Sequence, residues 1–318
     1  MFTTARLSTN SFVEIPCRVD PSRARPCYHQ GWMTLHSSFL RLLCFFGLCA
    51  WLSLQSASAP SVGAGNSQSA NSKPVVHFTD IAQKTGLTAP VIFGGENTKK
   101  YIIETTGTGV AIFDYDNDGW PDIFVVNGTT LDALPTAKSP TSHLYRNNHD
   151  GTFTDVAVMA GCAYSDGGHE QAGMGVAVAD YDCDGWFDIF KTNFADDTCN
   201  LYHNNGDGTF TDVTFASGVG VNNRYVAWGC AFIDYDNDGW QDILQVNGHV
   251  YPEIDNYHLD QTFKNPRLVY KNLGKGQFKD VSAEMGPGIT ERFSSRGAAS
   301  RGSPARCPEF RIATASDR

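Results

Sequence analysis

Twelve aspartates lie in three nine-residue segments that share one spacing. Each segment has Asp at positions 1, 3, 5 and 9 and Gly at position 6; loop 1 is 114–122, loop 2 is 180–188 and loop 3 is 234–242. Four carboxylates this close repel one another unless a hard cation lies between them. Ligands that are all oxygen are typical of Ca²⁺, which takes about six to eight of them. We therefore expect about three Ca²⁺ ions, one in each loop.

The candidate ligands are the four carboxylates of each loop and the main-chain carbonyl of the tryptophan at position 7. They are Asp114, Asp116, Asp118, Trp120, Asp122, Asp180, Asp182, Asp184, Trp186, Asp188, Asp234, Asp236, Asp238, Trp240 and Asp242. The glycine at position 6 permits a sharp turn. A solvated acidic turn is the alternative for one loop, but three loops in the same register favour calcium.

An EF-hand does not fit these loops. Its twelfth position carries a bidentate Glu, whereas the twelfth residues here are Val125, Lys191 and Gln245. Its flanks are helical, whereas the flanking residues here are β-rich. The loops are therefore expected to join β-strands.

Each loop lies inside a longer repeat, and successive loops begin 66 and then 54 residues apart. Every repeat contains an apolar segment before the loop, another after it, a Leu-Tyr or Val-Tyr segment and a Phe-x-Asp-Val segment. In the first repeat these are 110–113, 123–126, 144–148 and 153–156. Four short strands per repeat at this period describe a β-propeller blade. The fold class is therefore all-β, with about three complete four-stranded blades.

Two further segments repeat parts of a blade. Residues 77–81 carry the fourth-strand pattern without the other three, so we expect an orphan outer strand there. Residues 297–300 resemble the start of a first strand, but no acidic loop follows them. The sequence thus predicts an incomplete ring.

Charge separates the middle of the chain from its ends. The net charge is −10, but residues 60–300 alone hold 30 acidic against 15 basic residues. Five parts are expected: a possible over-extended N-terminus (1–32), a signal peptide (33–59), a flexible linker (60–74), the repeats (75–300) and a patternless tail (301–318). The signal is predicted from a thirteen-residue apolar run followed by Ser-Ala-Ser-Ala. The tail suggests a frameshift near residue 300.

The repeats resemble FG-GAP/VCBS repeat proteins, the calcium-looped blades of integrin α-chains, and more closely the secreted cartilage-acidic-protein-like (ASPIC/UnbV) group. The resemblance covers about Val75 to Ser300 and is carried by the three loops and by residues 169–175, 247–252 and 294–299. It implies a propeller of the seven-bladed type with calcium at the matching aspartates. Members of the group continue further, so this chain is expected to be truncated.

Two histidines are tempting catalytic candidates. His169 and His249 each lie beside a glycine-rich stretch, but neither has a visible partner for a triad or a zinc site. We expect both to be structural and no residue to be catalytic. The tryptophans of the loops could form a sugar-binding surface, although packing beside the loops explains them equally well.

Other residues carry weaker expectations. Cys162 and Cys199 are the first pair to test for a disulfide, because export permits one. Cys230 is expected to be a small apolar residue in a buried strand, and Cys183 to point away from the ion. Asn127 begins an Asn-Gly-Thr sequence that is a glycosylation sequon only if a glycosylating cell secretes the chain.

These features predict a secreted or periplasmic calcium-binding repeat protein that acts in adhesion, matrix contact or glycan and protein binding. The expected partner is an extracellular protein or glycan. An enzyme acting on extracellular polysaccharide is the alternative function, and a structural piece of a surface assembly is a third. Excess acidic charge argues against nucleic acid, and no membrane span is expected after signal removal.

Overall fold

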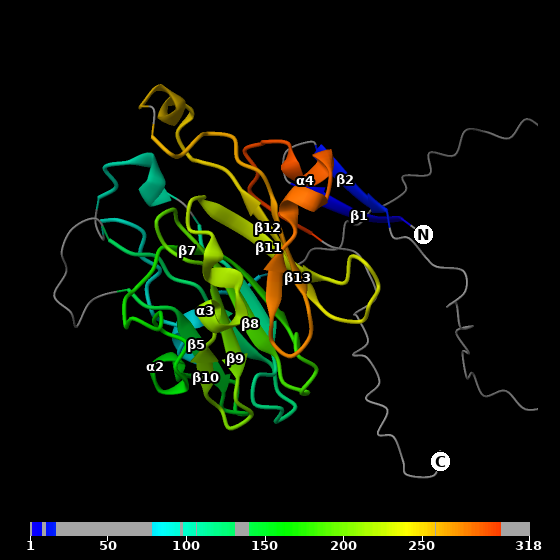
Figure 1. The fold of residues 1–318 in the computed structure, drawn as a ribbon. Helices are drawn as coiled ribbons and strands as arrows, with labels where there is room; N and C mark the ends of the chain where they lie inside the picture. The colour runs from blue at the N-terminus through cyan, green and yellow to red at the C-terminus, as the bar shows by residue number, and fades with distance from the viewer. Residues whose placement is uncertain are drawn as a thin grey trace, which may run out of the picture. The chain divides into compact units, whose positions relative to one another are not determined.

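The computed structural model describes residues 2–7, 11–16, 78–95, 98–105, 107–130, 140–257 and 259–299. The predicted signal peptide, linker and tail lie outside the described residues. Near the N-terminus, β1 (Phe2–Leu7) pairs with β2 (Ser11–Pro16) as an antiparallel hairpin. The repeat region contains three separate four-stranded antiparallel sheets, as the sequence predicts (Figure 1).

Each sheet is one repeat, and its strands pair in chain order. Blade 1 consists of β3 (Val110–Phe113), β4 (Asp122–Val125), β5 (His143–Asn147) and β6 (Phe153–Asp155). Blade 2 consists of β7 (Gly173–Ala179), β8 (Asp188–Asn193), β9 (Asn200–Asn204) and β10 (Phe210–Asp212). Blade 3 consists of β11 (Ala227–Ile233), β12 (Asp242–Asn247), β13 (Leu268–Asn272) and β14 (Phe278–Asp280).

Short helices link and flank the blades. The α-helices are α1 (Ala82–Thr85), α2 (Ala157–Ala160), α3 (Thr214–Ser217) and α4 (Pro287–Thr290). The 3₁₀ helices are η1 (Ile102–Thr105), η3 (Val219–Val221), η4 (Pro252–Tyr257) and η5 (Ser282–Glu284). No helix among the described residues is long and apolar enough to cross a membrane.

A short helix follows the fourth strand of each blade, a feature that the strand pattern did not predict. Its first turn is held by the aspartate of the Phe-x-Asp segment: Asp155 Oδ1 accepts the Ala157 N–H at 3.1 Å, and Asp212 Oδ1 accepts that of Thr214 at 3.0 Å. Residues 78–86 repeat this sequence, and α1 is the matching helix. The structure assigns no strand to residues 78–81, because a strand is recognised by its pairing. The predicted orphan strand is therefore absent from the described residues.

The core lies in the seams between neighbouring blades. Phe124 and Val126 of blade 1 pack in one cluster with Ile189 of blade 2. Phe190 on the opposite face of β8 packs with Ile243 of blade 3. Because successive side chains of a strand point to opposite faces, β8 contributes to both seams.

The innermost strands approach one another near their starts, at Gly109, Gly175 and Gly229. A Cβ at Gly109 would lie 2.8 Å from the carbonyl oxygen of Met174, and one at Gly175 only 2.0 Å from that of Trp228. These contacts leave no room for a side chain. A Cβ at Gly229 would likewise lie 2.6 Å from the Ala298 amide nitrogen. The segment that resembles the start of a further blade thus lies beside blade 3 as an inner strand would.

Blade 1 has one sheet face without a neighbouring blade among the described residues. Val110 and Ile112 are 54% and 67% exposed. Their counterparts in blade 2, Val176 and Val178, pack against the seam with blade 1. The described residues thus form three adjacent blades and show no closed ring.

In blades 2 and 3, one asparagine links the blade to the blade before it. Asn204, at the end of β9, donates to the carbonyl of Tyr115 in loop 1 at 2.8 Å. Asn272, at the end of β13, donates to the carbonyl of Tyr181 in loop 2, also at 2.8 Å. Both asparagines are fully buried. Asn147 has the same place in blade 1, but its amide donates only within its own blade, to Pro121.

We expect Asn204→Ala to lower the free energy of unfolding by about 2 kcal/mol, because it leaves the buried Tyr115 carbonyl without a donor. Asn147→Ala is the matched control and should cost less than about 1 kcal/mol, since it removes no bond between blades. Urea unfolding of both variants measures the difference. Equal losses would show that the link between blades contributes nothing.

Lys191 is a fully buried cation in the seam between blades 1 and 2. Its Nζ donates to Gln171 Oε1 at 3.0 Å, and Gln171 Nε2 donates to Asp197 Oδ1 at 2.6 Å. Burial lowers the pKa of Lys191 to about 8. Gln171, a residue of the 169–175 motif, therefore connects Lys191 to Asp197 in a buried polar network.

This pKa predicts a pH-dependent stability. An unfolded lysine titrates near pH 10.4, so between about pH 8 and 10.4 the unfolded chain holds a proton that the folded chain has released. The stability of wild type relative to Lys191→Met should rise by roughly 3 kcal/mol over this window. Urea unfolding between pH 7.5 and 10.5 tests this. Gln245→Met, at the same register in blade 3, is the control because it removes no charge. Its free energy of unfolding should differ from that of wild type by the same amount at every pH. If the difference in free energy of unfolding between wild type and Lys191→Met also stayed the same at every pH, the prediction would be wrong.

Candidate metal centres

The three loops fold in the same way because the same hydrogen bonds hold them. The carboxylate at position 1 accepts the N–H groups of positions 5 and 6, and the carboxylate at position 5 accepts that of position 7. These nine bonds are 2.8–3.1 Å long. Position 4 is left-handed in each loop, with φ of 54°, 63° and 58° at Asn117, Cys183 and Asn237. Cys183 thus takes the backbone role of an asparagine.

The aspartate at position 9 is completely buried in every loop. One of its oxygens accepts the N–H of the tyrosine at position 2, at 3.1–3.2 Å. The other accepts the N–H of the asparagine that ends the third strand, at 2.8 Å. Burial raises the pKa of Asp122 and Asp188 to about 6 and that of Asp242 to about 7.

Loop folding brings ligand oxygens from separate positions together. Carboxylate oxygens within 4.8 Å of one another come from Asp114, Asp116 and Asp122, from Asp180, Asp182 and Asp184, and from Asp234, Asp236 and Asp242. Oxygens on opposite sides of one Ca²⁺ are about 5 Å apart, because each lies about 2.3–2.6 Å from the ion. The spacing therefore suits a single calcium ion in each loop.

The aspartate at position 3 supplies an independent test of this fit. Asp116 Oδ1 and Asp182 Oδ1 are buried and have no hydrogen-bond partner. Burial, followed by the neighbouring Asp118 and Asp184 carboxylates, raises the pKa of Asp116 and Asp182 respectively. A buried carboxylate oxygen without a partner is costly, and a divalent cation would remove that cost. The loops fit calcium; the carbonyl of the tryptophan at position 7 stays a predicted ligand.

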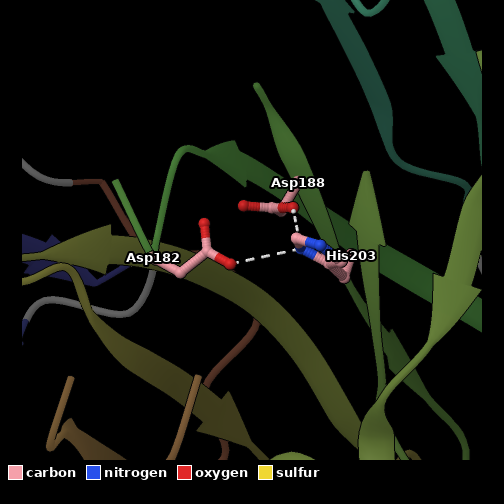
Figure 2. Close-up of side chains that lie close together, drawn as sticks. All are labelled: Asp182, Asp188 and His203. Atoms are coloured by element: carbon pink, nitrogen blue, oxygen red, sulfur yellow. Dashed lines mark ion pairs between the residues drawn. The ribbon is translucent and has the colours of Figure 1, made fainter. Parts of the chain in front are cut away.

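A basic side chain on the third strand of blades 2 and 3 reaches the loop, and the sequence analysis missed it. In blade 2, His203 Nδ1 lies 3.3 Å from both Asp182 Oδ2 and Asp188 Oδ1 (Figure 2). In blade 3, Lys271 Nζ contacts Asp236 Oδ2 and lies 3.1 Å from Asp238 Oδ2. The residue before the asparagine that ends the third strand is basic in all three repeats. This pattern could have predicted the contact from the sequence.

The tryptophans at position 7 pack on the hairpin between the third and fourth strands of their own blade. Trp120 stacks on His149 with ring centroids 5.1 Å apart. At the equivalent hairpin positions, Gly206 and Gly274 lie against the Trp186 and Trp240 rings. The tryptophans therefore pack beside the loops, which is the alternative that the sequence analysis set against a sugar-binding surface.

The two candidate histidines do not form a catalytic constellation among the described residues. His249 Nδ1 accepts the Tyr251 N–H at 3.1 Å, so the ring stabilises a turn. Burial lowers the pKa of His249, which favours its neutral form. His169 is exposed, and its backbone N–H is bound by Ser165 Oγ at 3.3 Å.

Two other expectations change. Cys162 and Cys199, the first pair to test for a disulfide, do not form one, because both are free, buried thiols. Burial raises the pKa of each thiol to about 12. The sequon asparagine, Asn127, is 2% exposed and its side chain bonds Ile92 and Pro90. A folded chain cannot present this amide for glycosylation.

Comparison with known proteins agrees with the repeat assignment. A family model described as an FG-GAP-like repeat matches residues 114–190 and 193–244. The chain contains FG-GAP-like repeats. Its FG-GAP-like region is similar to cartilage acidic protein 1 of Homo sapiens, with 28% identity over 184 residues, which is 56% of this chain and 24% of that protein. The chain thus spans about a quarter of this relative.

A solved structure is similar over part of the chain. It is a lectin from Agrocybe aegerita, described as recognising non-reducing terminal N-acetylglucosamine, with 20% identity and a TM-score of 0.29. The match covers 56% of this chain and 39% of the lectin. The family-model match confirms the expected resemblance to FG-GAP repeat proteins, and the three sheets confirm the expected four-stranded blades.

The loop geometry predicts that calcium stabilises the fold. Millimolar Ca²⁺ should raise the melting temperature by at least about 5 °C over EDTA, because an ion that binds only the folded state adds its binding free energy. Asp116→Asn should reduce this shift without lowering the melting temperature in EDTA, because it removes a repelling charge that has no donor at Oδ1. Asp166→Asn, in an exposed turn, is the control and should keep the full shift. An unchanged melting temperature with Ca²⁺ would contradict calcium binding.

Proposed function

We propose that the chain is a secreted calcium-binding repeat protein of the β-propeller type that acts by binding an extracellular protein or glycan. The observation that carries this proposal is the set of three loops with one geometry, two of them with an orphaned carboxylate oxygen. The predicted signal peptide supports export. Calcium would hold the loop that joins the first two strands of each blade, so binding would depend on calcium through folding.

A groove between blades 1 and 2 supports a binding role. It has a volume of about 530 Å³, which lies within the range of small-molecule sites. Tyr115, Met159 and Trp186 supply apolar lining, and Arg146 and Asp207 supply polar groups. The Trp186 ring beside charged and hydrogen-bonding groups suits a sugar or a peptide side chain.

Binding is favoured over catalysis because neither candidate histidine has a base, nucleophile or metal partner among the described residues. An enzyme acting on extracellular polysaccharide remains the competing function. Incubation of the calcium-loaded full chain with polysaccharides, followed by reducing-end assays, separates the two functions. Turnover that His169→Ala or His249→Ala abolishes would replace the binding proposal.

The groove predicts which exposed residues matter for the ligand. Arrays of glycans and matrix proteins, probed with the full chain in Ca²⁺ and in EDTA, should identify a calcium-dependent ligand. Met159→Glu should then weaken binding by about tenfold, because a charge enters an apolar wall of the groove. Val158→Glu is a matched control, since Val158 is also exposed on α2 but does not line the groove. Equal affinities for both variants would place the ligand elsewhere.

A further inference from the structure

The three loops have nearly identical backbones but differ in the cation that their own blade supplies. The residues at the equivalent position of the third strand are Arg146, His203 and Lys271. Only the last of these is both permanently charged and paired with two loop carboxylates among the described residues. The loops are therefore chemically unequal, although their aspartates match one for one.

Lys271 occupies oxygens that calcium needs in loop 3. Its Nζ contacts Asp236 Oδ2 and lies 3.1 Å from Asp238 Oδ2. These are the carboxylates at positions 3 and 5, both candidate ligands. An ammonium and a calcium ion cannot share the same lone pairs, and their like charges repel.

The ring of Tyr235 also helps to hold Lys271 beside loop 3. Its Nζ lies over the ring of Tyr235, 5.7 Å from the centroid. Tyr115 and Tyr181, the counterparts of Tyr235, are buried against Phe210 and Phe278 of the following blade. Tyr235 is half-buried, and its ring is available to an ammonium.

We propose that Lys271 is a built-in competitor for the cation of loop 3, so that the three calcium sites are graded and loop 3 fills at the highest calcium concentration. This inference rests on the proposed calcium binding. A protein with graded sites responds to calcium in steps: loops 1 and 2 fill first, and blade 3 becomes rigid only at higher concentrations.

The opposite role for Lys271 makes the opposite prediction. If Lys271 served to hold the two carboxylates in place for the ion, its removal would weaken calcium binding. The direction of the change in affinity therefore decides between competitor and organiser.

Hydrogen exchange with mass spectrometry tests the proposal, because peptides that cover 114–122, 180–188 and 234–242 report each loop separately. The full chain is titrated with Ca²⁺, and the midpoint of protection is measured for each peptide. In wild type we expect the 234–242 midpoint to be the highest. Lys271→Gln should lower that midpoint by about tenfold, the effect of removing one charge beside a divalent ion in a solvated site, and leave the other two unchanged.

Two further variants control for structure. Lys271→Arg keeps the charge and should keep the wild-type midpoint within about twofold. Lys279→Gln, on the neighbouring β14, removes a lysine that pairs with Glu284 rather than with the loop, and should change no midpoint. An unmoved or raised 234–242 midpoint in Lys271→Gln, with loops 1 and 2 still responding, overturns the inference alone. No response of any loop in wild type overturns calcium binding itself.

Discussion

The buried aspartate at position 9 is the group on which each blade depends. Its two oxygens accept one N–H from the acidic loop and one from the end of the third strand. A carboxylate with no solvent contact must be satisfied by such donors. The same bond places the asparagine whose side chain reaches the preceding loop. In blades 2 and 3, the loop, the blade and the seam are therefore one connected hydrogen-bonded unit.

That arrangement links the candidate calcium sites to the fold. The carboxylates at positions 1 and 5 fold the loop through backbone N–H groups, whereas position 3 keeps a buried oxygen free in loops 1 and 2. Metal binding would act on the residues that shape the loop. Ion occupancy would thus change the stability of whole blades rather than of a local turn.

Much of this could be predicted from the sequence, because the responsible patterns are local. The three loops, their aspartates and the four strands of each blade follow from spacing and alternation within a few residues. The first strand of blade 1 has the predicted bounds, and β4 begins one residue earlier than predicted, at the candidate ligand Asp122. The short helices were missed because the Asp that begins them was assigned to a strand.

The sequence by itself determined the repeat, the acidic loops and their candidate calcium ligands, because each of these depends on residues that are neighbours in the chain. Only the tertiary structure decided which side chains from distant strands meet them. It separated Cys162 from Cys199 as free thiols, buried the sequon at Asn127 and placed Lys271 against loop 3. Those outcomes depend on packing between segments far apart in the sequence, which local spacing does not encode.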